Sequence, residues 1–122
     1  MLNFNSLLIF SEKPKSLADF YQKVFDKKPD WEDGEYIGFS VGNGMITVGP
    51  HDKVHGKNMN PERIMFNLES KNVKEEFKRL KEMDIPIIQE LYHPMDDSDV
   101  LIATFKDPDG NYFQIASPME MD

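Results

Sequence analysis

The stretch Leu7-Leu8-Ile9-Phe10 and the stretch Ile64-Met65-Phe66-Asn67-Leu68 open the two halves of this sequence, 57 positions apart. Each is an apolar, strand-forming run, and each is followed by a segment whose apolar residues recur at helical spacing. A hairpin pattern follows each helical segment, and the closing strands read Met45-Ile46-Thr47-Val48 and Tyr112-Phe113-Gln114-Ile115. The repeat predicts two curved half-sheets that pair around a cleft.

Composition sets the broad class of the protein. The 122 residues are 39% hydrophobic and 30% charged, which is typical of one soluble globular domain. A net charge of −8 makes nucleic-acid binding unfavourable, because such a surface repels phosphate groups. No apolar run reaches the roughly 20 residues of a membrane-spanning helix, and residues 1–5 do not resemble a signal peptide. The lack of cysteine excludes a thiol nucleophile and favours a cytoplasmic location.

The first half is predicted to form module 1, at about 3–49. We expect a strand at 3–10, a helix that begins within 12–16 and ends near Phe25, and a short irregular strand that begins at Trp31. Pro14 suits the first turn of the helix, because its missing N–H would be unpaired there anyway. Strands 36–41 and 45–48 form a hairpin across Gly42-Asn43-Gly44, a strong turn signal.

The second half is predicted to form module 2, at about 62–117. A polar loop at 50–61 connects the modules within a single domain, 1–122. We expect a strand at 62–69, a helix at 71–83, and strands near 87–92, 100–106 and 111–117. Asp107-Pro108-Asp109-Gly110 carries its residues where a type I turn prefers them, and so separates the last two strands.

Two βαβββ units, the helix pattern Ser16-Leu17-Ala18-Asp19-Phe20-Tyr21 and the turn Asp107-Pro108-Asp109-Gly110-Asn111 point to one family. Over nearly its whole length the chain resembles the vicinal oxygen chelate superfamily, which includes glyoxalase I, extradiol dioxygenases, and fosfomycin and bleomycin resistance proteins. The resemblance implies an α+β fold, in which two βαβββ modules form a curved mixed sheet around a cleft. It also implies a homodimer, because many members are dimers.

The resemblance implies where metal ligands would stand in this sequence. Metal-using members have one ligand early in each opening strand and one in the middle of each closing strand. These positions hold Ser6 and Arg63 in the openers, and Thr47 and Gln114 in the closers. Strand alternation independently places the four on the cleft side, with Ile64 and Phe66 facing the helix. Neutral hydroxyl and amide groups beside a fixed positive charge make a poor site for a divalent ion, so we expect no metal cofactor.

The same cleft positions suit an organic ligand. Arg63 could hold a carboxylate or phosphate through two hydrogen bonds, or could instead pair with an acidic neighbour such as Glu62 or reach solvent. Ser6, Thr47 and Gln114 could orient a polar ligand, or could simply be hydrated residues on a wet sheet face. The predicted ligand-binding set is completed by residues that could form apolar or stacking walls, namely Phe39, Met65, Tyr92 and Tyr112, with Tyr36, Met45 and Phe105 as further candidates. Trp31 could line the cleft mouth or anchor its strand.

No catalytic residues stand out. His51 and His55 are four positions apart, but Pro50 and Gly56 argue against a helix that would bring them together, so solvated loop histidines are favoured over a metal site with His93. The sequence therefore favours a metal-free small-molecule binding protein of the bleomycin-resistance-like type. The alternatives are a metal-dependent glyoxalase-, lyase- or dioxygenase-like enzyme with atypical ligands, and a non-metal enzyme that uses Arg63 to bind an oxyanion.

Overall fold

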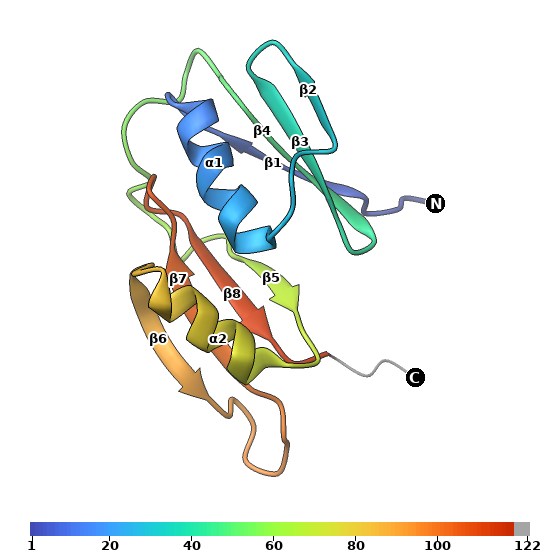
Figure 1. The fold of residues 1–122 in the computed structure, drawn as a ribbon, viewed down its shortest axis with the longest axis vertical. Helices are drawn as coiled ribbons and strands as arrows, with labels where there is room; N and C mark the ends of the chain where they lie inside the picture. Colours follow the sequence, from blue (N-terminus) through green and yellow to red (C-terminus); the bar gives the residue numbers. More distant parts are fainter. Residues whose placement is uncertain (119–122) are drawn as a thin grey trace. The chain divides into compact units, whose positions relative to one another are not determined.

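The computed structural model describes residues 1–118, which form two compact units divided after Lys57 (Figure 1). The first unit contains five elements: β1 (Ser6–Phe10), α1 (Pro14–Phe25), β2 (Trp31–Asp33), β3 (Tyr36–Val41) and β4 (Gly44–Gly49). Its sheet has the order β1-β4-β3-β2, with β1 parallel to β4 and the other pairs antiparallel. This is the βαβββ module that the sequence predicts.

Helix α1 covers one face of the first sheet because one of its sides is apolar. Leu17, Tyr21 and Val24 are at most 4% exposed. The ring of Phe25 stacks on Tyr21 with centroids 5.4 Å apart and meets Phe39 of β3 edge-on at 5.3 Å. The helix ends where Asp26 takes a left-handed conformation, with φ of 54°. The predicted end of the helix near Phe25 is confirmed.

The second unit repeats the arrangement with β5 (Phe66–Glu69), α2 (Val73–Glu82), β6 (Ile87–Tyr92), β7 (Ile102–Lys106) and β8 (Tyr112–Ala116). Its sheet order is β5-β8-β7-β6, so β5 takes the place of β1. The rings of Phe66, Phe113 and Phe105 stack in sequence across three strands, with centroids 5.8–5.9 Å apart, and Phe77 of α2 packs on Phe105. The α+β class and the duplicated module are therefore confirmed.

Both opening strands begin later than predicted; β1 begins at Ser6 instead of residue 3, and the later start of β5 changes the candidate site. The prediction started this second strand at residue 62, but β5 begins at Phe66, and the N–H of Arg63 donates to the carbonyl of Asn60 in a turn. Ile64, which was predicted to face the helix, is 75% exposed. Proline at position 61 suits a turn and has no N–H to give to a sheet ladder, so the chain bends before it becomes a strand.

The turn before β8 is held together by a buried carboxylate. Asp107 is 2% exposed and accepts hydrogen bonds from the N–H groups of Asp109 and Asn111 and from the side-chain amide of Asn111, each at 2.9 Å. Asn58 then donates its side-chain amide to Oδ1 of Asn111 at 3.0 Å, and its N–H to the carbonyl of Asp109. These two hydrogen bonds attach Asn58, in the loop at 50–61, to this turn.

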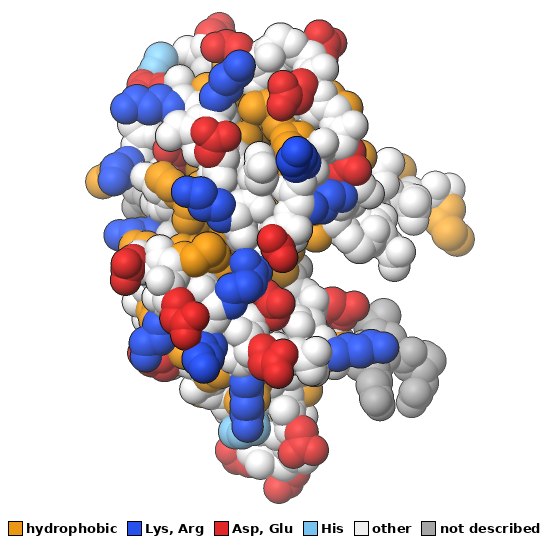
Figure 2. Space-filling model, viewed as in Figure 1, with side chains coloured by type: hydrophobic (Ala, Val, Ile, Leu, Met, Phe, Trp, Pro, Cys, Tyr) orange, Lys and Arg blue, Asp and Glu red, His pale blue; other side chains and the backbone are white. Residues whose placement is uncertain are grey.

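The visible surface of each unit carries charges of both signs. Figure 2 shows Lys and Arg side chains interspersed with Asp and Glu side chains, with apolar areas between them. In the part of the chain that the structure describes, no helix has the length and apolarity needed to cross a membrane.

Candidate functional site

Each sheet has one face packed on its helix and one face directed away from it, which we call the helix-free face. Side chains alternate along a strand, so the burial of Ile46 and Val48 under α1 places Met45, Thr47 and Gly49 on the helix-free face of β4. Strand register then arranges this face of the first sheet in three cross-strand rows. The rows are Ser6, Met45 and Ser40; Leu8, Thr47, Gly38 and Trp31; and Phe10, Gly49, Tyr36 and Asp33.

Two aromatic rings lie directly over glycines on this face. A Cβ atom added to Gly38 would lie 2.1 Å from Nε1 of Trp31, so the indole occupies the space that a side chain at 38 would need. A Cβ atom at Gly49 would likewise lie 2.3 Å from Cδ1 of Tyr36. Glycine is required at both positions because the rings approach the backbone so closely. Trp31 is nevertheless 40% exposed and Tyr36 43% exposed.

A polar hollow lies at the β3–β4 hairpin, and it includes Thr47, the register partner of Gly38. Its volume is about 420 Å³. Among residues 1–118, none of the lining side chains is charged. The lining consists of Asn5, Ser6, Ser40, Gly42, Asn43, Gly44, Met45 and Thr47. Gly42 has φ of 57°, which a tight hairpin turn needs and which glycine adopts without strain. Ser6 and Thr47, two of the predicted ligand-binding residues, are thus brought together in one hollow.

The helix-free face of the second sheet carries a polar row. Asn67, Gln114, Thr104 and Gln89 stand side by side across the four strands. The side-chain amide of Gln114 donates to Oγ1 of Thr104 at 3.0 Å, so this amide already has a partner within the sheet. Tyr112 and Tyr92 belong to the neighbouring rows of the same face, opposite Lys106 and Ile102.

Two of the predicted ligand-binding residues, Phe39 and Arg63, are not where the sequence placed them. Phe39 is fully buried on the helix side, in contact with Phe25, so it does not line the helix-free face. Phe105, a further candidate wall, is fully buried as well. Arg63 is exposed in the turn that precedes β5 and is not part of the strand. Met65 lies immediately before β5 and is 40% exposed.

Sequence reasoning missed the true neighbours of Thr47 and Gln114. Thr47 is paired with Leu8 in β1, and Gln114 is paired with Asn67 in β5, which relates the two opening strands by 59 positions instead of 57. Asn67 and Thr104 were therefore absent from the predicted set. The signal was present in the alternation of Phe66-Asn67-Leu68-Glu69, which turns Asn67 to the same side as Gln114.

The residues present do not fit a divalent metal ion. Ser6, Thr47 and Gln114 offer only neutral oxygen donors, whereas transition metals prefer imidazole, thiolate or carboxylate ligands. Within residues 1–118, no three His, Asp or Glu side chains lie close enough together to hold a metal. No step of a reaction can therefore be assigned to a metal held by these side chains.

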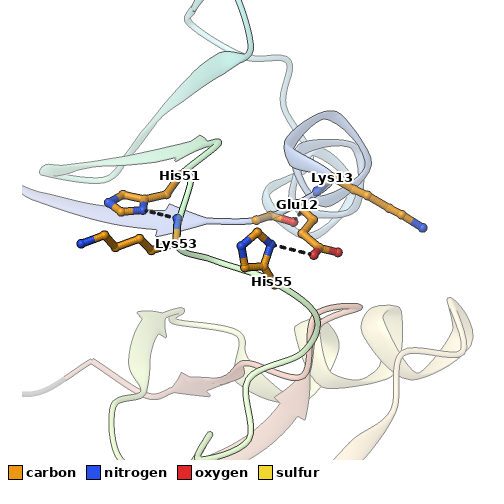
Figure 3. A network of polar contacts seen from close by, with 6 residues as sticks. Glu12, Lys13, His51, Lys53 and His55 are labelled. Atoms are coloured by element: carbon orange, nitrogen blue, oxygen red, sulfur yellow. Dashed lines mark hydrogen bonds and ion pairs between the residues drawn. The ribbon is translucent and has the colours of Figure 1, made fainter.

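The histidines make local contacts in the loops that contain them. Nδ1 of His55 lies 3.2 Å from Oε1 of Glu12, and Nδ1 of His51 accepts a hydrogen bond from the N–H of Lys53 at 3.1 Å (Figure 3). The ring of His51 also meets Phe10 edge-on, with centroids 5.2 Å apart. His93 lies 3.1 Å from the carbonyl of Val100 in the second unit.

The carboxyl group that binds the backbone of Ser40, a residue of the hollow, has a shifted pKa. Asp30 forms an ion pair with Lys27 at 2.7 Å and accepts the N–H of Ser40 at 2.6 Å. The hydrogen bond from Lys27, followed by that from Ser40, lowers the pKa of Asp30 below its ordinary value of 3.8. The segment after α1 is thereby attached to β3 by a charge that persists into acid.

Comparison with known proteins places this architecture in a family. The model described as Glyoxalase/Bleomycin resistance protein/Dioxygenase superfamily matches residues 3–115. The search of curated proteins gave no match. A solved structure described as a conserved domain protein is similar with a TM-score of 0.80 at 19% identity, over 97% of this chain and 100% of that one.

Two further solved structures carry more specific descriptions. TioX from Micromonospora sp. ML1 has a TM-score of 0.73 at 14% identity, over 96% of this chain and 99% of that one. Lactoylglutathione lyase from Agrobacterium tumefaciens has a TM-score of 0.73 at 15% identity, over 94% and 92%. At such identities the similarity establishes the fold alone. The family model, by contrast, covers nearly the whole chain, and the protein accordingly belongs to the Glyoxalase/Bleomycin resistance protein/Dioxygenase superfamily, which confirms the resemblance to the vicinal oxygen chelate proteins.

Proposed function

We propose that this protein is a metal-free small-molecule binding protein of the bleomycin-resistance-like type. The observation that carries the proposal is the chemistry of the helix-free faces. Three of the four positions where the resemblance implies metal ligands hold Ser6, Thr47 and Gln114, whose neutral groups suit hydrogen bonds to an organic molecule, and the fourth holds Arg63. The uncharged hollow of about 420 Å³ at Ser6 and Thr47 has the size of a small-ligand site.

The first test measures metal. Purified protein is dialysed against a mild chelator, and its metal content is determined together with its thermal unfolding temperature. We expect no stoichiometric metal and no change in unfolding temperature on addition of Zn²⁺, Ni²⁺, Mn²⁺ or Fe²⁺, because a bound ion would stabilise the folded state. A tightly held ion would reinstate the metal-dependent glyoxalase- or dioxygenase-like alternative and overturn the proposal.

The second test locates binding in the hollow. A fragment library is screened by ligand-observed NMR, and the best binder is titrated against Ser6→Ala and Thr47→Val, which each remove one hydroxyl. Each loss should weaken binding by about two- to tenfold, the usual range for one neutral hydrogen bond. Ser16→Ala removes a hydroxyl from the exposed side of α1 and serves as the control. Equal affinities for all three variants would show that the hollow is not the site.

Two other expectations stay predictions. The resemblance favours a homodimer, and the absence of cysteine favours a cytoplasmic location. Analytical ultracentrifugation over a range of protein concentrations measures the first directly, because a dimer has twice the mass of the single chain.

A further inference from the structure

The aromatic rings over Gly38 and Gly49 form a fixed surface on the face that carries Thr47 of the hollow. Each ring has one side against the sheet backbone and remains two-fifths exposed. Tyr36 is held further by its hydroxyl, which donates to the carbonyl of Pro50 at 3.4 Å. Rings that are already held in place lose little conformational freedom when a ligand stacks on them, so they are well suited to binding.

The two rings are neighbours on the helix-free face. Trp31 stands opposite Gly38, and Tyr36 is two residues from Gly38 along β3. Trp31 and Tyr36 are therefore diagonal neighbours, whose Cβ atoms are typically somewhat less than about 7–8 Å apart. Each ring lies over a glycine of the adjacent strand, so the two rings are neighbours that cover the same face of the sheet. Such a surface matches a flat, fused-ring molecule, because every aromatic ring presents a face for stacking.

A carboxylate stands beside the rings on the same face. Asp33 is exposed and is the register partner of Tyr36, whereas Glu32 lies on the opposite face because side chains alternate. Residues 30–35 carry four carboxylates, of which Asp30 is paired with Lys27. An aromatic surface next to an acidic group is complementary to an organic cation, which gains both stacking and charge attraction.

We propose that the helix-free face of the first sheet binds planar aromatic cations, stacked on Trp31 and Tyr36 with their charge toward Asp33. The proposal rests on the proposed binding function and adds the chemical class of the ligand. The proposed ligand is a cation because the charge beside the rings is negative, whereas the ligand that Arg63 could hold would be an anion. The occupant proposed for this face is a small molecule.

Trp31 is the single tryptophan of the chain, so its fluorescence reports on this site alone. The chain is titrated with N-methylquinolinium, and separately with naphthalene-1-sulfonate, an anion of similar ring size. We expect saturable quenching with the cation and binding at least about fivefold weaker with the anion, because exposed charge pairs and cation–π contacts together are worth about this much. Added salt should weaken binding of the cation.

Two matched variants distinguish the effect of the local charge on binding from the effect of the net charge. Asp33→Asn should weaken binding of the cation about two- to fivefold, whereas Glu32→Gln, with the same charge change on the other face of β2, should leave it unchanged. Calorimetry should show about tenfold weaker binding for Trp31→Ala and a smaller loss for Trp31→Phe, which retains an aromatic ring. Equal effects of Asp33→Asn and Glu32→Gln, or wild-type affinity in Trp31→Ala, would overturn the proposal.

The outcomes distinguish this inference from the proposed function. If fragments bind at the hollow but N-methylquinolinium does not perturb Trp31, the ligand class is wrong and the binding function stands. If tightly bound metal is found, the binding function itself fails. If Trp31 emission changes with protein concentration alone and ultracentrifugation shows dimers, a second copy of the chain occupies this face and the inference is refuted.

Discussion

A methyl group added at Gly38 should dislodge Trp31. The Cβ of Gly38→Ala would lie 2.1 Å from the indole nitrogen, so the ring must move away from the sheet. Trp31 is 40% exposed, so the covered part is roughly 90–150 Å² if a buried tryptophan covers roughly 150–250 Å². At about 25 cal/mol per Å², complete loss of that cover costs roughly 2–4 kcal/mol.

Replacing glycine with alanine also stabilises the strand itself. Glycine in a strand interior is less stable than alanine by about 0.5–1 kcal/mol. The net loss in free energy of unfolding should therefore be about 1–3 kcal/mol. Urea unfolding followed by circular dichroism measures it, and the native emission of Trp31 should move to longer wavelength because the indole becomes hydrated.

A double-mutant cycle isolates the cause. In a Trp31→Ala background the ring is absent, so Gly38→Ala should be neutral or stabilising by up to about 1 kcal/mol. The difference between the two backgrounds is the coupling between ring and glycine. If Gly38→Ala costs the same stability with and without Trp31, or leaves the wild-type emission unchanged, the ring does not lie over Gly38 and the reasoning is refuted.

Three other substitutions test the remaining features. Asp107→Ala should lower the free energy of unfolding by about 2–4 kcal/mol in urea titrations, because three hydrogen bonds to a buried carboxylate are lost; Asp96→Asn, in an exposed loop, should change it little. The lowered pKa of Asp30 contributes stability that is present above pH 3.8 and is lost as the pH falls through its folded-state pKa. The thermal unfolding temperature of the wild-type protein should therefore fall more in acid than that of Asp30→Asn. Parallel acid profiles would contradict this. Arg63→Ala should leave calorimetric affinity for small carboxylates unchanged, because the residue lies in an exposed turn; a tenfold loss would restore it as an anion clamp.

Alternation along strands predicted much of the fold and part of the site. Apolar Ile46 and Val48 had to face a helix, so Thr47 had to face away, and the same argument placed Gln114 correctly. The rule depends on knowing where a strand begins. A turn begins at Asn60 and Pro61, and hydrophobic periodicity does not show where this turn ends. Arg63 was therefore assigned to the strand, although the strand begins three residues later.

The aromatic surface could not be read from one strand alone. Gly38 has no side chain, so it adds nothing to the pattern of β3, and the apolar residues at 36, 37 and 39 cannot all share one face. Tyr36 faces away from the helix while Phe39 is buried beneath it. That Trp31 covers Gly38 depends on the register between β2 and β3, which only pairing in three dimensions defines.

The two modules show how little the interior constrains what each sheet presents to a ligand. Leu8, Thr47 and Gly38 in one module stand where Asn67, Gln114 and Thr104 stand in the other, yet the positions one step along each strand stay apolar in both. Substitutions on one side of the backbone therefore spare the packing on its other side. A chain built this way has wide mutational freedom, and it can exchange one specificity for another without having to evolve a new core.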